Sequence, residues 1–537
     1  MKHADHDFVL YNAGRSKTFK ETVEKYRRKH GRHPPPGFKE WYRFARERNV
    51  YNIDDFDQIN TDLRPFWAIL PPGMRHYAAH ASDIPGHSVS ALSIREGQDF
   101  QELWGWRSET FVKMLLGFAH WLPDMDIAMH CMDQPRVVMP WEEIQEMLKT
   151  EEQSRTVKEE GVVDGDPSTH TGEVSGILSG MQLSTLNMSM IRRRTMAGSG
   201  MADSSIWTLW RRLVHRTLML EIQRGFITNF NTSSDLCTVG PQLSNLHGML
   251  FASSSTQATH KLKRDKRYQH NDEQGYSWED KDDVMPWRGV TSGGTAFNDK
   301  PELWHEKHRQ RLVQLTNATL LASENTTAAI LALSPEIDPP HYTTQSFNPS
   351  SFAANHTNLG FTEYLACLPT GDFYNNTFAI QNQTTFTQTF AAKYLVDVDG
   401  HSFSGRWRAF LQSRSLGIKA TGFREWHDSR LFAWRQFVPM DNRCSLLTYL
   451  IGLSGDGGGN GGEVVMVSRH DYEAFTLARL GRKWAAQVLR REDLEIYAFR
   501  LLLEYGRVID DGRERMGVVG NGGREMVEFD PRPPALV

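Results

Sequence analysis

The sequence lacks the features of a membrane-spanning or zinc-binding chain. Its 537 residues contain no run of about eighteen apolar residues, the length that a transmembrane helix requires. The first residues, MKHADHDFVLYNAGRSK, have no apolar segment of signal-peptide length. Only four cysteines occur, at positions 131, 237, 367 and 444, and no CxxC spacing suggests zinc. One or two disulfides and four buried thiols are both compatible with this spacing.

A strong excess of charge of one sign is also absent. Lys and Arg number 61 against 65 Asp and Glu, which gives a net charge of −4. Phosphate backbones require concentrated Lys and Arg, so this balance argues against nucleic acid as a partner. Two basic runs, at residues 192–194 and 261–267, are interpreted as solvated faces.

The chain is longer than one hydrophobic core usually serves, so we expect two main domains. We place a helical extension at residues 1–95, an acceptor-side domain at 96–284, a donor-binding domain at 285–515 and a tail at 516–537. Strands are expected at 125–131 and from residue 285, and helices at 206–224, 471–490 and 492–507. The glycine run at 455–462 is followed by no phosphate-loop Lys-Ser/Thr, so it predicts a surface loop.

Residues 393–440 carry the most informative pattern in the chain. Residues 394–398 predict a buried strand, 400–405 a loop of small residues, and Arg406 the start of a helix. A helix N-terminus presents free backbone N–H groups and partial positive charge, which suit a diphosphate. The order strand, loop, helix therefore predicts an anion site at the carboxyl end of a parallel sheet.

Four blocks in order resemble glycosyltransferase family 90, which groups fungal capsule-associated xylosyltransferase-like proteins with animal protein O-glucosyltransferases. KYLVDVDGHSFSGRWRAFLQSRSLGIKATGFREWHDSRLFAWRQFVPM at 393–440 resembles the family's nucleotide-sugar half, and WRGVTSGG at 287–294 the start of its donor domain. LPDMDIAMHCMDQPRV at 122–137 resembles its acceptor-side strand. Residues 26–67 are similar to the N-terminal region of the fungal branch.

The resemblance implies an α/β fold of GT-B type, in which two Rossmann-like domains face a cleft and the C-terminal half holds a UDP-sugar. It implies an inverting transferase that moves a sugar, xylose as first choice, to a hydroxyl of a glycan or glycoprotein. A protein O-glucosyltransferase is the second choice, and a catalytically inactive carbohydrate-binding protein is the alternative of another class.

The resemblance also implies a Golgi or endoplasmic-reticulum lumenal location, with membrane contact only through an anchor that this chain does not contain. Sequons compatible with a lumenal protein occur at Asn187, Asn231, Asn317, Asn325, Asn355, Asn375 and Asn382.

Asp133 is the candidate catalytic base. It follows the strand predicted at 125–131 and precedes Gln134 and Pro135. The residues alone favour a turn-capping aspartate. The resemblance implies a general base instead, because MHCMDQPRV matches the family segment that carries one. His130 and Cys131 differ from the smaller or amide-bearing residues usual at those positions.

The candidate donor-binding residues lie in two segments. Arg288 and Gly289 belong to the WRG motif, and a guanidinium fits phosphate oxygens better than a lysine does. The second segment contributes Ser404, Gly405 and Arg406 from SGRWR, and Glu425 from REWHD, which the resemblance places near the ribose.

A metal-dependent donor site is the alternative to a site built on arginines. Asp397 and Asp399 form a DxD tripeptide, the device that holds Mn²⁺ on a diphosphate in some glycosyltransferases. Such tripeptides are common by chance, and the resemblance implies a metal-independent site. We therefore expect arginines in place of a cation and no cofactor besides the UDP-sugar co-substrate. His427 and Asp428 are interpreted as local hydrogen-bonding residues.

Overall fold

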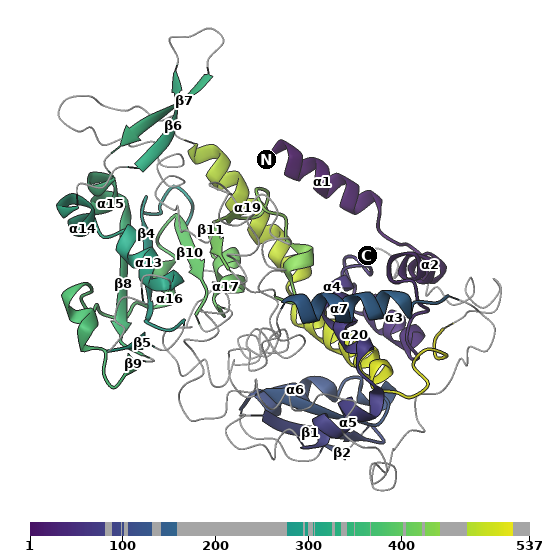
Figure 1. Cartoon of the computed structure of the whole chain (residues 1–537). Helices are drawn as coiled ribbons and strands as arrows, with labels where there is room; N and C mark the ends of the chain where they lie inside the picture. Colours follow the sequence, from purple (N-terminus) through teal and green to yellow (C-terminus); the bar gives the residue numbers. More distant parts are fainter. Residues whose placement is uncertain are drawn as a thin grey trace.

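The computed structural model gives the fold shown in Figure 1. The described residues are 1–80, 89–97, 99–100, 106–130, 141–157, 276–293, 296–298, 304, 307–324, 328–334, 341–347, 349–365, 367–400, 404–421, 425–440 and 470–518. Asp133, the helix predicted at 206–224 and the glycine run at 455–462 lie outside these residues.

Short helices open the chain. Thr18 caps α2 by accepting from the backbone N–H of Glu21, and Gly31 ends it in the left-handed conformation (φ 63°). Trp41, Tyr42 and Phe44 are buried on α3. The bounds are α1 (Lys2–Ala13), α2 (Phe19–His30), α3 (Phe38–Glu47), α4 (Asp57–Leu63), η1 (Arg64–Ala68) and α5 (Pro71–His80).

The C-terminal helix α20 (Arg491–Val508) packs among these N-terminal helices (Figure 1). The indole N–H of Trp41 donates to the carbonyl of Ile496 at 3.0 Å, and the rings of Phe44 and Phe499 meet edge to face. α19 (Asp471–Val488) precedes it and packs against α17 (Trp407–Gln412). The N-terminal helices and the end of the described chain therefore share one hydrophobic core.

A small antiparallel sheet lies beside that core. Its strands are β1 (Val89–Arg95), β2 (Asp99–Phe100) and β3 (Met125–His130), in the order β2-β1-β3. Nearby helices are α6 (Trp106–Leu115), η3 (Ala119–Trp121) and α7 (Trp141–Gln153). β3 confirms the strand expected there, but these described strands are antiparallel rather than Rossmann-like. β1 and β3 pair with each other although β1 lies before, and β3 after, the domain boundary predicted at residue 95.

The other core is built on parallel strands. β4 (Met285–Val290) pairs with β8 (Thr357–Glu363), and β10 (Tyr394–Val398) pairs with β11 (Leu416–Ala420), which pairs with β12 (Val438–Pro439). β10 and β11 are buried at every residue, as parallel strands covered on both faces are. A parallel bridge between Asp282 and Ala392 joins the two sheets just before β4 and β10.

The strands consequently follow the spatial order β8, β4, β10, β11, β12. The chain leaves β4 for β8 on one side and returns to β10 on the other side. In open α/β sheets, a ligand binds in the crevice at the carboxyl ends of the strands where the order reverses. This topological switch point lies between the loops that follow β4 and β10.

Further elements surround the parallel strands. They are β5 (Ala296–Phe297), α13 (His308–Leu315), α14 (Ala318–Ser323), α15 (Ser350–His356), β9 (Cys367–Leu368), η8 (Asp372–Asn376), α16 (Phe386–Thr389) and η9 (Asp428–Arg430). The antiparallel pair β6 (Ala328–Ser334) and β7 (His341–Phe347) projects from this part in Figure 1.

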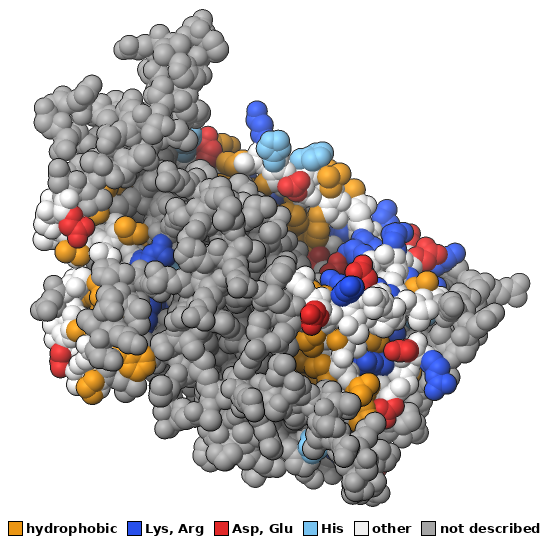
Figure 2. Space-filling view, viewed as in Figure 1, with side chains coloured by type: hydrophobic (Ala, Val, Ile, Leu, Met, Phe, Trp, Pro, Cys, Tyr) orange, Lys and Arg blue, Asp and Glu red, His pale blue; other side chains and the backbone are white. Residues whose placement is uncertain are grey.

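The described surface carries charges of both signs. In Figure 2, Lys and Arg side chains are interspersed with Asp and Glu over the side occupied by the N-terminal helices. None of the helices within the described residues has the length and apolar composition needed to cross a membrane.

Candidate functional site at the carboxyl ends of the parallel strands

The structure brings Gly289 and Arg406 together at the switch point. A Cβ atom on Gly289 would lie 3.3 Å from Nη2 of Arg406 and 2.6 Å from the Trp287 ring. The guanidinium of Arg406 lies over that ring, with its Cζ 5.6 Å from the ring centroid. A larger side chain at position 289 would therefore clash with the Trp287 ring and crowd the guanidinium. We call Trp287, Gly289 and Arg406 the cationic corner.

Arg406 occupies the N-cap position of α17, a helix of only six residues. The helix predicted from Arg406 onward is thus present but short, so the guanidinium, more than the helix terminus, would supply positive charge. Gly405 and Arg406 are half-buried, and Ser404 is buried. The Ser404 hydroxyl favours the ionised form of Asp397 and so lowers the pKa of that carboxyl.

Arg288 points away from this corner. Alternation along β4 places Arg288 on the face opposite Trp287 and Gly289. Its Nη1 donates to the carbonyl of Asn358 on β8 at 2.6 Å and its Nε to the carbonyl of Asn382 at 3.3 Å. The structure therefore does not bring the two predicted arginines together.

A buried ionic cluster lies below the loops that follow β10 and β11. Lys419 on β11 is the register partner of Asp397 on β10, with its Nζ 3.5 Å from Oδ2 of that aspartate. The same ammonium donates to Oε2 of Glu425. Lys419 thus connects the strand that leads into the predicted diphosphate loop with the predicted ribose-binding carboxylate.

Burial and charge act in opposition within this cluster. Burial raises the pKa of Asp397, while the Lys419 ammonium and the Ser404 hydroxyl lower it. Burial lowers the pKa of Lys419, but the facing carboxylates of Glu425 and Asp397 outweigh it and raise that pKa overall. The ammonium is therefore charged at neutral pH and compensates the carboxylates.

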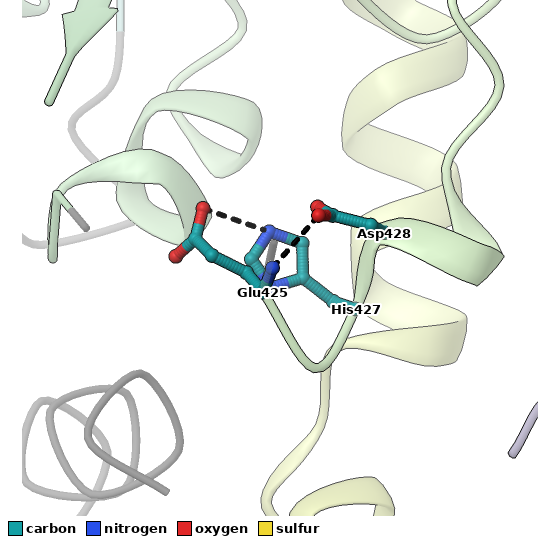
Figure 3. A group of neighbouring side chains, drawn as sticks. All are labelled: Glu425, His427 and Asp428. Atoms are coloured by element: carbon teal, nitrogen blue, oxygen red, sulfur yellow. Dashed lines mark hydrogen bonds and ion pairs between the residues drawn. The ribbon is translucent and has the colours of Figure 1, made fainter. Parts of the chain in front are cut away.

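Glu425, His427 and Asp428 form a second group around the same glutamate (Figure 3). Oδ2 of Asp428 accepts from the backbone N–H of Glu425 at 2.7 Å, and Nε2 of His427 lies 3.7 Å from Oε2 of Glu425. Burial, followed by the charges of Lys419 and Arg430, holds the pKa of His427 well below its usual range, so the imidazole is neutral.

These three residues have the spacing of a metal site, but their surroundings suit a cation poorly. Glu425 already faces the Lys419 ammonium, and Asp428 already accepts a backbone hydrogen bond. A bound metal would have to displace or tolerate the ammonium beside its own carboxylate ligand.

Sequence reasoning missed two residues that organise the site. Lys419 stands within the apolar strand LGIKA, and a charged residue in a buried strand signals a partner, because Lys is almost never fully buried alone. Arg309, on α13, donates to the loops after both β4 and β10. Nothing in the local sequence distinguishes it from a surface arginine. Asp133 lies outside the described residues.

A comparison with protein families gives a match in the part of the chain that carries most of the parallel strands. Residues 352–513 match the model of glycosyl transferase family 90. The matched range contains β8, β10, β11, the Ser404–Arg406 loop and Glu425, and it ends after α20. The blocks at 26–67, 122–137 and 287–294 precede it, so the match does not test them.

A search of curated proteins gives no match. The family match covers β8, β10, β11 and β12 and the Ser404–Arg406 loop, while β4 and Gly289 precede it. A member of this family is a sugar transferase, which implies a sugar donor and a glycan acceptor. Residues 352–513 are therefore similar to glycosyl transferase family 90, and this match supports membership of the chain in that family.

Proposed function

We propose that the protein is an inverting glycosyltransferase that moves a sugar from a UDP-sugar to a hydroxyl of a glycan or glycoprotein. Xylose is our first choice of sugar, and a GT-B arrangement is our proposed architecture. The observation that carries the proposal is the convergence of Gly289 and Arg406 at the switch point between β4 and β10. The family match over the second of these segments gives it independent support.

The proposed reaction is a single displacement. Asp133 takes the proton of the acceptor hydroxyl, and the hydroxyl oxygen forms a bond with the anomeric carbon. The bond from that carbon to the diphosphate oxygen breaks, and UDP leaves with the electron pair. Attack from the opposite face inverts the anomeric centre. Arg406 would stabilise the charge that develops on the leaving diphosphate.

The cluster around Glu425 would serve the nucleoside end of the donor. Among the described residues, Lys419 and His427 both face Oε2 of Glu425, and we propose Oε1 as the acceptor for a ribose hydroxyl. We propose that no metal takes part, because the ammonium of Lys419 already faces the Glu425 carboxylate and Arg406 supplies a cation beside the loop. Arg288 would support the site from behind by holding β4 to β8.

Calorimetric titration with UDP tests the donor site. Wild-type protein should bind UDP, and Arg406→Ala should weaken binding about 10- to 100-fold, the worth of a hydrogen bond to a charged group. Arg288→Ala is the matched control, because Arg288 is the other arginine that the sequence predicted at the donor site. We expect a smaller loss of UDP affinity, because its guanidinium faces backbone carbonyls. Equal losses in both variants would contradict the assignment of the two strand faces.

Transfer assays with a panel of UDP-sugars test the donor. We expect turnover with UDP-xylose to exceed turnover with UDP-glucose, and the anomeric configuration of the product to be inverted. Retention of configuration would exclude direct displacement. A Golgi or endoplasmic-reticulum lumenal location belongs to the same proposal and is tested by co-localisation with lumenal markers in expressing cells.

A further inference from the structure

We propose that Arg309 is a positioning residue that fixes the loop after β4 against the loop after β10 and thereby sets the geometry of the donor site. This inference rests on the proposed function, because it assigns Arg309 a role in binding the nucleotide sugar. Arg309 lies in the first turn of α13 and is 8% exposed. It is not among the residues that the family resemblance singled out.

The guanidinium of Arg309 bonds to both loops at once. Its Nε donates to the carbonyl of Asp399, the residue after β10, at 3.1 Å. Its Nη1 donates to the carbonyl of Val290, the last residue of β4, at 3.2 Å and to the hydroxyl of Ser292 at 2.5 Å. One rigid fork therefore links the carboxyl ends of the two strands that flank the switch point.

The two loops are also in close contact beside this fork. A Cβ on Gly400 would lie 2.8 Å from Nη2 of Arg309 and 3.0 Å from Oγ of Ser292. Gly293 has a φ of +112°, and its added Cβ would lie 3.4 Å from the carbonyl oxygen of Gly400. Glycines at 293 and 400 let the two backbones approach closely enough for a single guanidinium to serve both.

Gln310, the next residue on α13, contacts only one of the two loops through the bonds described here. Nε2 of Gln310 donates to the carbonyl of Thr291 at 2.9 Å and to the Tyr374 hydroxyl at 3.1 Å. Both bonds hold Gln310 to residues outside the loop after β10, and the first of them fixes the loop after β4. Arg309 is the member of this pair that spans both.

A shift of these loops would reach the proposed diphosphate site directly. The Cζ of Arg309 lies 5.7 Å from the centroid of the Trp287 ring, and that of Arg406 lies 5.6 Å from the same centroid. Gly289 packs on that ring as well. Loss of the fork would remove a hydrogen bond from the carbonyls of Asp399 and Val290 and let Arg406 move relative to Gly289. Misplacement by about 1 Å can cost a site roughly a hundredfold.

The test compares Arg309→Met with Arg513→Met. Arg513 is also buried, and it donates to the carbonyls of Ile69, Val508 and Trp67 in the N-terminal core. We expect both variants to unfold at lower temperature. Only Arg309→Met should weaken UDP binding, by about 10- to 100-fold, and raise the KM for the donor more than it lowers kcat. Arg309→Lys should recover part of the affinity, because one ammonium can reach some of the carbonyls.

A double-mutant cycle with Gly400→Ala gives an independent measurement. The added methyl should press on the Arg309 guanidinium and weaken UDP binding in the wild-type background. In the Arg309→Met background the same methyl should cost much less, so the two effects should not add. Additive effects would overturn the inference. If Arg309→Met does not fold, Arg309→Lys completes the cycle.

The possible failures are distinguishable. If wild-type protein does not bind UDP, the proposed function fails. If wild-type protein binds UDP and a folded Arg309→Met binds it equally well, the proposed function stands and the positioning role of Arg309 is refuted. If Arg513→Met weakens UDP binding as much as Arg309→Met, the effect reflects general destabilisation, and the inference is likewise refuted.

Discussion

Replacement of Lys419 by methionine removes the cation from the buried cluster formed with Asp397 and Glu425 beside the proposed donor site. Lys419 is 1% exposed and lies between the carboxylates of Asp397 and Glu425, which are 2% and 4% exposed. Methionine keeps much of the length and apolar volume of the side chain. The substitution therefore removes the charge without leaving a large cavity, and two buried carboxylates lose their common partner.

The expected loss of unfolding free energy at pH 7 is about 3 to 5 kcal/mol, the usual result of removing one partner from a buried ion pair. The sign of its pH dependence follows from Asp397. Burial raises the folded-state pKa of this carboxyl, so the folded state takes up its proton more readily than the unfolded state does. Acidification should therefore return part of the lost stability in Lys419→Met, since a protonated carboxyl needs no counter-charge.

Wild-type protein should gain less stability over the same range, because the Lys419 ammonium holds down the pKa of Asp397 there. The pKa of Lys419 is raised, and a raised lysine contributes stability that is complete below its unfolded pKa and lost only at alkaline pH. The difference in stability between Lys419→Met and wild type should thus narrow as the pH falls from 7 toward 5.

Urea denaturation followed by tryptophan fluorescence measures this difference. Lys393→Met is the matched control, because Lys393 pairs with Asp471, whose side chain is 35% exposed. Water compensates the carboxylate there, and we expect a loss of less than about 1 kcal/mol. The loss of unfolding free energy in Lys419→Met could prove no larger than in the control, or could grow on acidification. Either result would refute the claim that Lys419 compensates the buried carboxylates of Asp397 and Glu425.

Much of the local structure could be predicted because local patterns determine it. The apolar run at 394–398 gives β10 with the expected bounds. The helices expected at 471–490 and 492–507 are α19 and α20. α19 buries one face, as an amphipathic segment does, whereas α20 is buried nearly all round. The strand β4 was likewise expected, and its period-2 pattern could also have placed Arg288 on the face opposite Gly289.

The assembly of the candidate site could not be predicted in the same way. Arg309 reaches carbonyls 19 and 90 residues away, and which carbonyls these are depends on the spatial order of β8, β4 and β10. The partner of Lys419 on β10 depends on the register of two strands separated by a helix. Hydrophobic periodicity predicts that strands form but carries no information on their order in the sheet.

The remaining predictions concern the chemistry. Transfer activity should persist in excess EDTA, because Arg406 and Lys419 supply the positive charge at the site; loss of turnover that Mn²⁺ alone restores would identify Asp397 and Asp399 as metal ligands. Asp133→Asn should lower transfer about a hundredfold or more, since the amide keeps the size of the carboxylate but cannot take the acceptor proton. UDP affinity should stay near the wild-type value in that variant, because Asp133 is proposed to act on the acceptor while Arg406 binds the diphosphate. Calorimetry and product formation, measured on the same preparation, separate the outcomes. Near wild-type transfer would mean that another group is the base, and a parallel loss of UDP affinity would mean that Asp133 has a structural role as a turn-capping residue.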